Sequence, residues 1–260
     1  DVILVGGVVS GAGLEINGDS SANGGGADTI TFSTVLSGSS IRGKGGKDVI
    51  SVSGIAGTGA EVLGNAGGDT ITAGTGDDVL TAGEGADKVI VGAGADQVVL
   101  TETTSAADNV AIVATTDGSA VGAAGGTFSG FNVITGFVSA MDDIVFDGNA
   151  NADDTVNTDI IRNGTAGLVK AGTAANNALN DITMSNYTSV DQVVNFLGDA
   201  GVAFTEAGNQ DQVVAVTIGT DFTAVYAFIE VGNNTAAATA AELFLIATVD
   251  ETLVAGDIIC

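Results

Sequence analysis

Apolar positions in the first hundred residues recur in a fixed pattern, each four places after a glycine and two after an aspartate. The pattern is G-G-x-G-x-D-x-U-x, in which U is a large apolar residue. Six windows follow it: Asn23 to Thr31, Gly43 to Ser51, Gly64 to Thr72, Ala73 to Thr81, Ala82 to Ile90 and Val91 to Val99. The last four are consecutive, so chance is a poor explanation.

These nonapeptides resemble the RTX family, the calcium-binding repeats of proteins exported by type I secretion. The resemblance implies that each nonapeptide is a glycine-rich turn followed by a short strand. It also implies that two nonapeptides make one coil of a right-handed parallel β-roll, with calcium between the turns of neighbouring coils. Glycine brings carbonyl oxygens close together and aspartate adds a hard anionic oxygen, which is the ligand set that calcium prefers.

The expected metal-site residues are therefore the aspartate at position six and the glycines of each turn. They are Asp28, Asp48, Asp69, Asp78, Asp87, Asp96, Gly24, Gly26, Gly43, Gly46, Gly64, Gly67, Gly74, Gly76, Gly83, Gly85, Gly92 and Gly94. The apolar residues at position eight are expected to point inward and stack: Ile30, Ile50, Ile71, Leu80, Val89 and Val98.

The aspartates are expected to form two ladders, because one coil of two nonapeptides returns the chain to the same edge of the roll. The first ladder holds Asp28, Asp48, Asp69 and Asp87, at intervals of 20, 21 and 18 residues. The second holds Asp78 and Asp96, and its earlier rungs fall in segments 37–43 and 57–64, which have no aspartate. We expect metal along the first edge, and on the second edge only near Asp78 and Asp96.

Glycine-aspartate turns can also build a solenoid without metal, in which each aspartate caps its own turn. Stacked coils lie about 4.8 Å apart. Two bare carboxylates at that spacing repel by about 3 kcal/mol at an effective dielectric constant of about 20. Several such pairs would consume much of the roughly 5–15 kcal/mol that stabilises a domain. The sequence therefore favours calcium.

The whole chain is strongly acidic, with 32 Asp and Glu against 6 Lys and Arg and a net charge of −26. Its apolar content of 45% is too high for a disordered acidic tail, so it must bury a core while cations neutralise its carboxylates. Basic residues gather only at Arg42, Lys44 and Lys47, which disfavours nucleic acid and anionic membranes as partners. No apolar run approaches the roughly 18 residues of a transmembrane helix.

Much of enzyme chemistry is excluded because the chain has no His and a single Cys, Cys260. Triads and zinc sites that depend on His do not fit, and neither does an intrachain disulfide framework. Cys260 could link two chains or remain a free thiol. Asp142 and Asp143 could in principle do acid–base work, but nothing in the sequence places two carboxylates across a cleft. We expect no enzymatic activity.

The sequence predicts an all-β protein with a parallel β-roll over residues 1–115 and a β-rich capping and secretion region over 116–260. Phe131 to Gly148 resembles the segment that follows the repeats in serralysin-type C-terminal domains, where Phe137, Asp142, Ile144 and Phe146 would close the roll. The alternative is an ordinary strand pair that caps an open end. One short helix is predicted from Ser189, which starts a capping box, and the last segments are predicted as antiparallel strands: Gln212 to Ile218, Phe222 to Val231, Leu243 to Val249 and Asp257 to Ile259.

Two further expectations concern less regular segments. The stretch from Thr115 to Gly130 is expected to be a surface loop. The acidic group Asp147, Asp153, Asp154 and Asp159 could hold another ion, or it could be a solvated loop. The start Asp1-Val2-Ile3 looks like the tail of a repeat, so we expect a longer precursor.

These features favour a calcium-dependent structural protein that is secreted, extracellular or at the cell surface, and that associates with itself into sheets or filaments. Type I secretion machinery is the partner that the resemblance implies during export. An alternative is the C-terminal secretion and folding module of a longer exported enzyme or adhesin. Fold analogy does not separate these functions.

Overall fold

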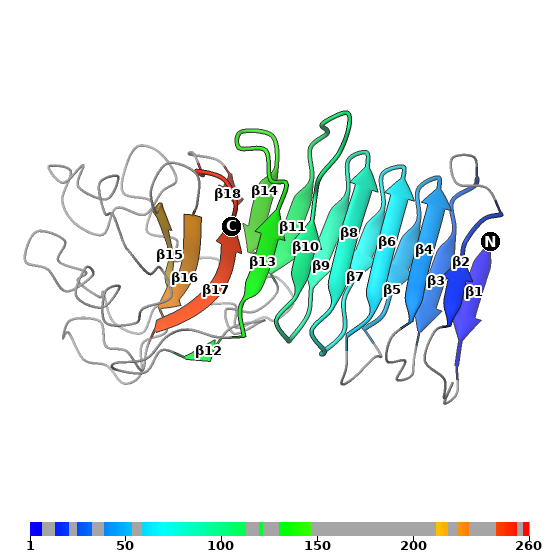
Figure 1. Ribbon diagram of the computed structural model, residues 1–260, viewed down its shortest axis with the longest axis horizontal. Coiled ribbons are helices and arrows are strands. Elements are labelled where there is room, and N and C mark those ends of the chain that lie inside the picture. The colour runs from blue at the N-terminus through cyan, green and yellow to red at the C-terminus, as the bar shows by residue number, and fades with distance from the viewer. Residues whose placement is uncertain are drawn as a thin grey trace, which may run out of the picture.

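The computed structural model describes residues 1–6, 14–20, 25–32, 39–53, 59–112, 120–121, 130–146, 212–217, 223–228, 243–253 and 257–259 (Figure 1). Within these ranges every regular element is a β-strand. The helix expected from Ser189, the acidic group that begins at Asp147, and Cys260 lie outside the described residues.

From β1 to β11 consecutive strands alternate between two sheets, so two strands make one coil of a parallel β-roll (Figure 1). In the first sheet every neighbouring pair is parallel. Its order along the roll is β1 (Val2–Val5), β3 (Thr29–Phe32), β5 (Val49–Ser51), β7 (Thr70–Thr72), β9 (Lys88–Val91), β11 (Asn109–Ile112), β14 (Asp143–Phe146) and β18 (Ile258–Ile259).

The second sheet faces the first and is also parallel through the repeats. Its parallel part runs in the order β2 (Glu15–Asn17), β4 (Ser40–Gly45), β6 (Glu61–Ala66), β8 (Val79–Glu84), β10 (Gln97–Val99), β13 (Asn132–Thr135) and β17 (Leu243–Val249). Strands β16 (Thr223–Phe228) and β15 (Gln212–Thr217) then extend it in antiparallel fashion.

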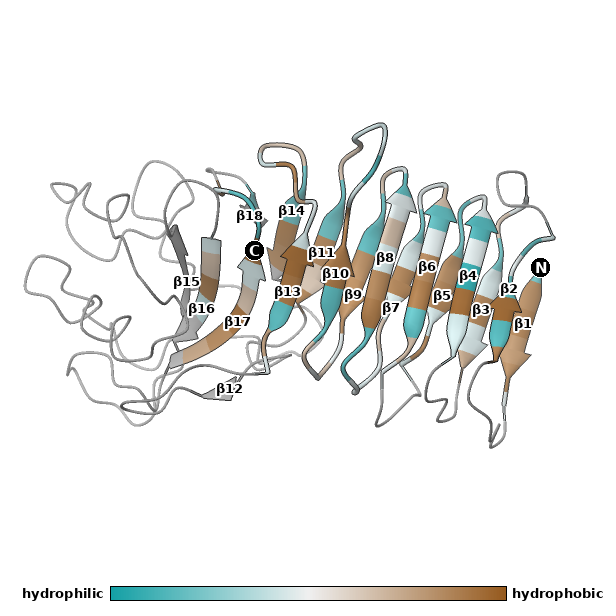
Figure 2. Ribbon diagram, in the orientation of Figure 1, coloured by the Kyte–Doolittle hydropathy of each residue, from teal (hydrophilic) through white to brown (hydrophobic). Residues whose placement is uncertain are grey.

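The core lies between the two sheets and is built from equivalent positions of successive coils. Ile30, Ile50, Ile71 and Val89 pair in register along the first sheet. Figure 2 shows the matching hydrophobic bands on successive strands. All six apolar residues predicted to point inward are fully buried, which confirms the nine-residue pattern: Ile30, Ile50, Ile71, Leu80, Val89 and Val98. Alternate residues face outward, as the two-residue period of a strand requires.

Both sheets continue past residue 115. β11 pairs with β14, and β10 pairs with β13, each in parallel. In the segment expected to close the roll, Phe137 is 4% exposed and Ile144 is fully buried. The segment therefore adds another coil to the stack.

Beyond the repeats, the structure corrects three of the expectations. β15, β16 and β17 are antiparallel as predicted, but β17 also pairs in parallel with β13, where Ile134 lies beside Val249. β18, predicted as part of the antiparallel group, pairs in parallel with β14. The stretch expected to be a surface loop contributes β12 (Ala120–Val121), which pairs with β17. Apolar strands from distant parts of the chain thus pair with the last coil and cover it.

Candidate metal centres along the two turn edges

The first ladder consists of aspartates that are buried although they carry ionisable groups. Asp48, Asp69 and Asp87 are each 1–2% exposed. The Oδ1 atom of each accepts a hydrogen bond from the backbone N–H of the ladder aspartate one coil earlier, at 2.8 Å for Asp28 to Asp48, 2.8 Å for Asp48 to Asp69 and 2.6 Å for Asp69 to Asp87. The four aspartates predicted on this edge therefore lie one above another.

The first ladder continues beyond the residues predicted for it. The N–H of Asp87 donates to Asp108 Oδ1 at 2.8 Å, and the N–H of Asp108 donates to Asp142 Oδ1 at 3.0 Å. No metal role was predicted for Asp108, because its turn has no glycine pattern. The available signal is Asp108-Asn109-Val110-Ala111, which keeps the D-x-U-x half of the repeat 21 residues after Asp87.

The second ladder has the same geometry but fewer carboxylates. Ala60 N–H donates to Asp78 Oδ1 at 2.6 Å, and Asp78 N–H donates to Asp96 Oδ1 at 2.9 Å. The next rung is Asn132, whose Oδ1 accepts from Asp96 N–H at 3.0 Å. The earlier rungs are Ser39 and Ala60. Their backbone carbonyl oxygens accept hydrogen bonds from the N–H groups of Glu61 and Val79 in the following coils. Among the described residues, the second ladder thus has an aspartate rung only at the two predicted positions, Asp78 and Asp96.

The glycines at position four let the turns approach closely. Gly46 and Gly67 have φ of +123° and +134°, a region that side chains rarely adopt. A Cβ atom on Gly67 would lie 1.6 Å from the carbonyl oxygen of Gly46 in the preceding turn. The same left-handed backbone is found at Gly83, Gly85 and Gly94.

The other predicted glycines differ in how closely the neighbouring turn approaches them. A Cβ on Gly92 would lie 1.7 Å from Gly74 O, and one on Gly94 would lie 2.5 Å from Gly76 O, so these turns also stack. Gly26 has open space around it. Gly24 lies outside the described residues.

Oxygen atoms line the space beside the Asp48 and Asp69 carboxylates of the first ladder. A Cβ on Gly64 would lie 2.5 Å from Asp69 Oδ2 and 2.2 Å from the carbonyl oxygen of Ala82, one coil further on. A Cβ on Gly43 would meet Asp48 Oδ2 at 2.3 Å and Gly64 O at 2.8 Å. Each glycine therefore leaves a gap that a carboxylate oxygen and a carbonyl oxygen face together.

The carboxylate oxygens that face these gaps lack a hydrogen-bond donor. Among the described residues, five ladder aspartates have a buried Oδ2 with no hydrogen-bond partner: Asp28, Asp48, Asp69, Asp87 and Asp96. A buried acceptor without a donor is costly, and a buried anion more so. Hard oxygen donors gathered without nitrogen or sulfur fit calcium. The predicted aspartates and the turn carbonyls would hold the ion, which would neutralise the ladder.

Two aspartates depart from this simple picture. Asp78 Oδ2 accepts from Gly74 N–H at 2.9 Å, so Asp78 caps its own turn as the metal-free alternative predicts. Asp19 was not predicted, yet its Oδ2 is also buried without a partner. It follows Gly18 in a turn without the regular spacing, so the repeat pattern could not identify it.

Burial dominates the acid–base behaviour of the ladders. It raises the pKa of Asp69 from 3.8 to about 6, and that of Asp87, Asp96 and Asp108 to about 7. The backbone hydrogen bond to each carboxylate lowers its pKa, but by less than burial raises it, and neighbouring carboxylates raise it further at Asp69, Asp87 and Asp96. Protons and calcium therefore compete for the same oxygen atoms.

The calcium-free roll is expected to lose stability as the pH rises from 5 to 8. Protons bind the folded carboxylates more tightly than the unfolded ones, so the stabilisation is full below about pH 4 and is lost as the pH passes the folded pKa values of about 6 to 7. Urea unfolding of calcium-stripped protein should show a midpoint that falls across this range. With saturating calcium the trend should reverse. A midpoint independent of pH in stripped protein would contradict the burial of these charges.

Comparison with known proteins agrees with the geometry. The family model of the RTX calcium-binding nonapeptide repeat, in four copies, matches residues 63–98, which contain β7, β8 and β9 and aspartates of both ladders. No curated protein matches the chain. No helix among the described residues is long and apolar enough to cross a membrane. Residues 63–98 thus carry RTX calcium-binding nonapeptide repeats, and these nonapeptides fold into a parallel β-roll.

Proposed function

We propose that this protein is a calcium-dependent extracellular structural protein that assembles with itself into a surface layer, filament or matrix. The observation that carries the proposal is the stack of buried carboxylates without donors, which supports a fold that requires calcium. Extracellular calcium-binding modules work at about 10⁻⁴–10⁻³ M calcium. A chain with this dependence would fold only after it has left the cell.

Charge supports assembly that is controlled by calcium. At a net charge of −26, copies of the chain repel one another until cations neutralise them. The outward faces of the sheets carry valines that are 36–46% exposed, at Val49, Val79 and Val133. Flat β faces with such residues can pack side by side once the repulsion is removed.

We propose that the chain has no catalytic activity of its own. It has no His, and most of the buried polar side chains among the described residues are rungs of the two ladders. Ladder carboxylates engaged with the backbone and with calcium are not available as general acids or bases.

The alternative function is a C-terminal folding and secretion module of a longer exported enzyme or adhesin, handled by type I secretion machinery. It is supported by β17 and β18, which add to the second and first sheets and cover the last coil. A roll finished in this way could fold as a unit behind another domain.

Electron microscopy with and without calcium separates the two functions. We expect ordered sheets or filaments at millimolar calcium and dispersed chains after chelation, with light scattering that rises and falls accordingly. A monodisperse monomer at millimolar calcium would refute self-assembly. The discovery of a catalytic domain in the precursor would then favour the alternative.

A further inference from the structure

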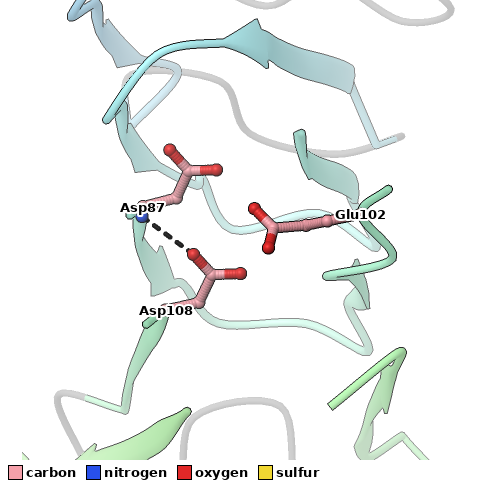
Figure 3. A group of neighbouring side chains, drawn as sticks. All are labelled: Asp87, Glu102 and Asp108. Carbon is pink, nitrogen blue, oxygen red and sulfur yellow. Dashed lines mark hydrogen bonds between the residues drawn. The ribbon is translucent and has the colours of Figure 1, made fainter. Parts of the chain in front are cut away.

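The turn between β10 and β11 has no glycine nonapeptide and instead brings Glu102 beside two rungs of the first ladder (Figure 3). One carboxylate oxygen from each of Asp87, Glu102 and Asp108 lies within 4.8 Å of the others. Asp87 and Asp108 are each 1% exposed, and Glu102 is partly buried. In Figure 3 the two aspartates lie one above the other and Glu102 approaches them from the opposite side.

A second observation points to a ligand among these groups. Asp87 Oδ2 is buried and has no hydrogen-bond partner among the described residues. The backbone N–H of Asp87 already donates to Asp108 Oδ1, so it is not available as a donor to Asp87 Oδ2. Three acidic groups thus share a space in which Asp87 Oδ2 has no donor.

Glu102 is held in place by backbone donors on both sides of the gap. Its Oε1 accepts from Gly85 N–H at 2.8 Å, in the turn one coil earlier, and its Oε2 accepts from Ala106 N–H at 2.6 Å, in its own turn. Glu84 secures the same turn independently, since it accepts from Thr103 N–H and Oγ1 at 2.8 and 2.6 Å. The Glu102 carboxylate is therefore positioned before any ion binds.

We infer that Asp87, at the end of the first ladder of the nonapeptides, forms a calcium site of three carboxylates with Glu102 and Asp108, which lie beyond the repeats. Calcium binds oxygen at about 2.3–2.6 Å, so two ligands on opposite sides of the ion lie up to about 5 Å apart, and three oxygens within 4.8 Å of one another fit. The repeat sites combine aspartate with turn carbonyls, whereas here a glutamate replaces the glycine turn. The site lies partly outside residues 63–98, which the family model matches.

Because affinity for calcium rises with the number of charged ligands, this site should be the tightest, by roughly tenfold over the repeat sites. It would fill first and fix the long turn against the coil before it. The inference does not depend on self-assembly, since it concerns ions bound to a single chain.

Calcium titration of the full chain by isothermal calorimetry, with bound ions counted by equilibrium dialysis, tests the site. We expect Glu102→Gln to bind one calcium fewer per chain and to lose the tightest phase. Glu84→Gln is the matched control, because it also removes one carboxylate charge that accepts hydrogen bonds from this turn. This variant should keep both the number of bound calcium ions and the tightest binding phase. The circular dichroism of each variant at saturating calcium shows whether the roll is folded.

A second variant guards against a loss caused by misfolding of the turn. Asp108→Asn keeps an Oδ1 acceptor for Asp87 N–H and removes only the charge, so it should lose the same calcium ion. An unchanged count and affinity in Glu102→Gln would overturn the site. A loss shared equally by Glu84→Gln would also overturn it, because the turn's stability would then be the cause.

Discussion

Chelation of calcium is expected to abolish the β-sheet circular dichroism signal of residues 1–115, and calcium near millimolar is expected to restore it. The cause is the first ladder, where Asp48, Asp69 and Asp87 are buried with one oxygen unpartnered. Each adjacent pair of ionised carboxylates repels by about 3 kcal/mol at an effective dielectric constant of about 20. Several pairs together approach the whole stability of a typical domain, about 5–15 kcal/mol.

The measurement is far-ultraviolet circular dichroism during titration with chelator and then with calcium. Magnesium at the same concentration is the control, since it keeps its water shell and demands tighter octahedral geometry, so it should restore much less signal. An unchanged spectrum in excess chelator at neutral pH would show that the roll folds without metal.

Asp69→Asn is expected to stabilise the calcium-free chain and to weaken its binding of calcium. Asparagine keeps an Oδ1 acceptor for Asp48 N–H, as Asn132 does for Asp96 N–H on the second edge, but it removes the buried charge. The variant should therefore resist urea better than the unaltered chain when calcium is absent and bind calcium more weakly. Lower stability in the absence of calcium would contradict the role of charge repulsion.

Gly67→Ala is expected to destabilise the calcium-loaded roll by about 2–6 kcal/mol. The new Cβ would lie 1.6 Å from Gly46 O, and the backbone has φ of +134°. A strained backbone costs about 1–3 kcal/mol, and overpacking costs about 1–3 kcal/mol more. Urea denaturation in millimolar calcium measures the effect, and the urea midpoint should fall. Calcium should also bind more weakly, because the new methyl group displaces the turn whose carbonyl oxygens face the ion.

Two other glycines separate the causes. Gly130 has φ of +70°, but no heavy atom of the described residues lies within 4 Å of the place that an alanine methyl group would take, so Gly130→Ala should show the backbone strain alone. Gly26 stands at the same turn position as Gly67, with open space, so Gly26→Ala should change stability little. Equal losses in Gly67→Ala and Gly26→Ala would mean that contact between turns is not what requires glycine.

The repeats could be predicted closely because their information is local. Position six and position eight of each nonapeptide determine which side chains reach the turn and which reach the core, and Asp69 and Ile71 lie where the pattern puts them. The spacing of the aspartates also predicted two unequal ladders, and the structure places Ala60 at the level of the second ladder where segment 57–64 has no aspartate.

The remaining features depend on contacts between distant residues. Asp108 and Asn132 join the ladders through turns that lack the glycine pattern, so only their place in the stack identifies them. In the sequence, Glu102 is one acidic residue in a polar loop, and its role depends on the coil before it. β17 lies about a hundred residues after β13, and an apolar strand of its kind could pair in many ways, so its parallel register was not predictable.

From Asp28 to Asp142 the rungs of the first ladder are separated by 20, 21, 18, 21 and 34 residues, yet all make the same hydrogen bond. Differences in turn length are therefore absorbed outside the stack, and each coil meets only the coil before and the coil after it. Duplication or deletion of a gene segment that encodes one coil would leave every remaining interface intact. The length of such a protein can thus change over evolution in steps of one coil, about 4.8 Å of roll at a time.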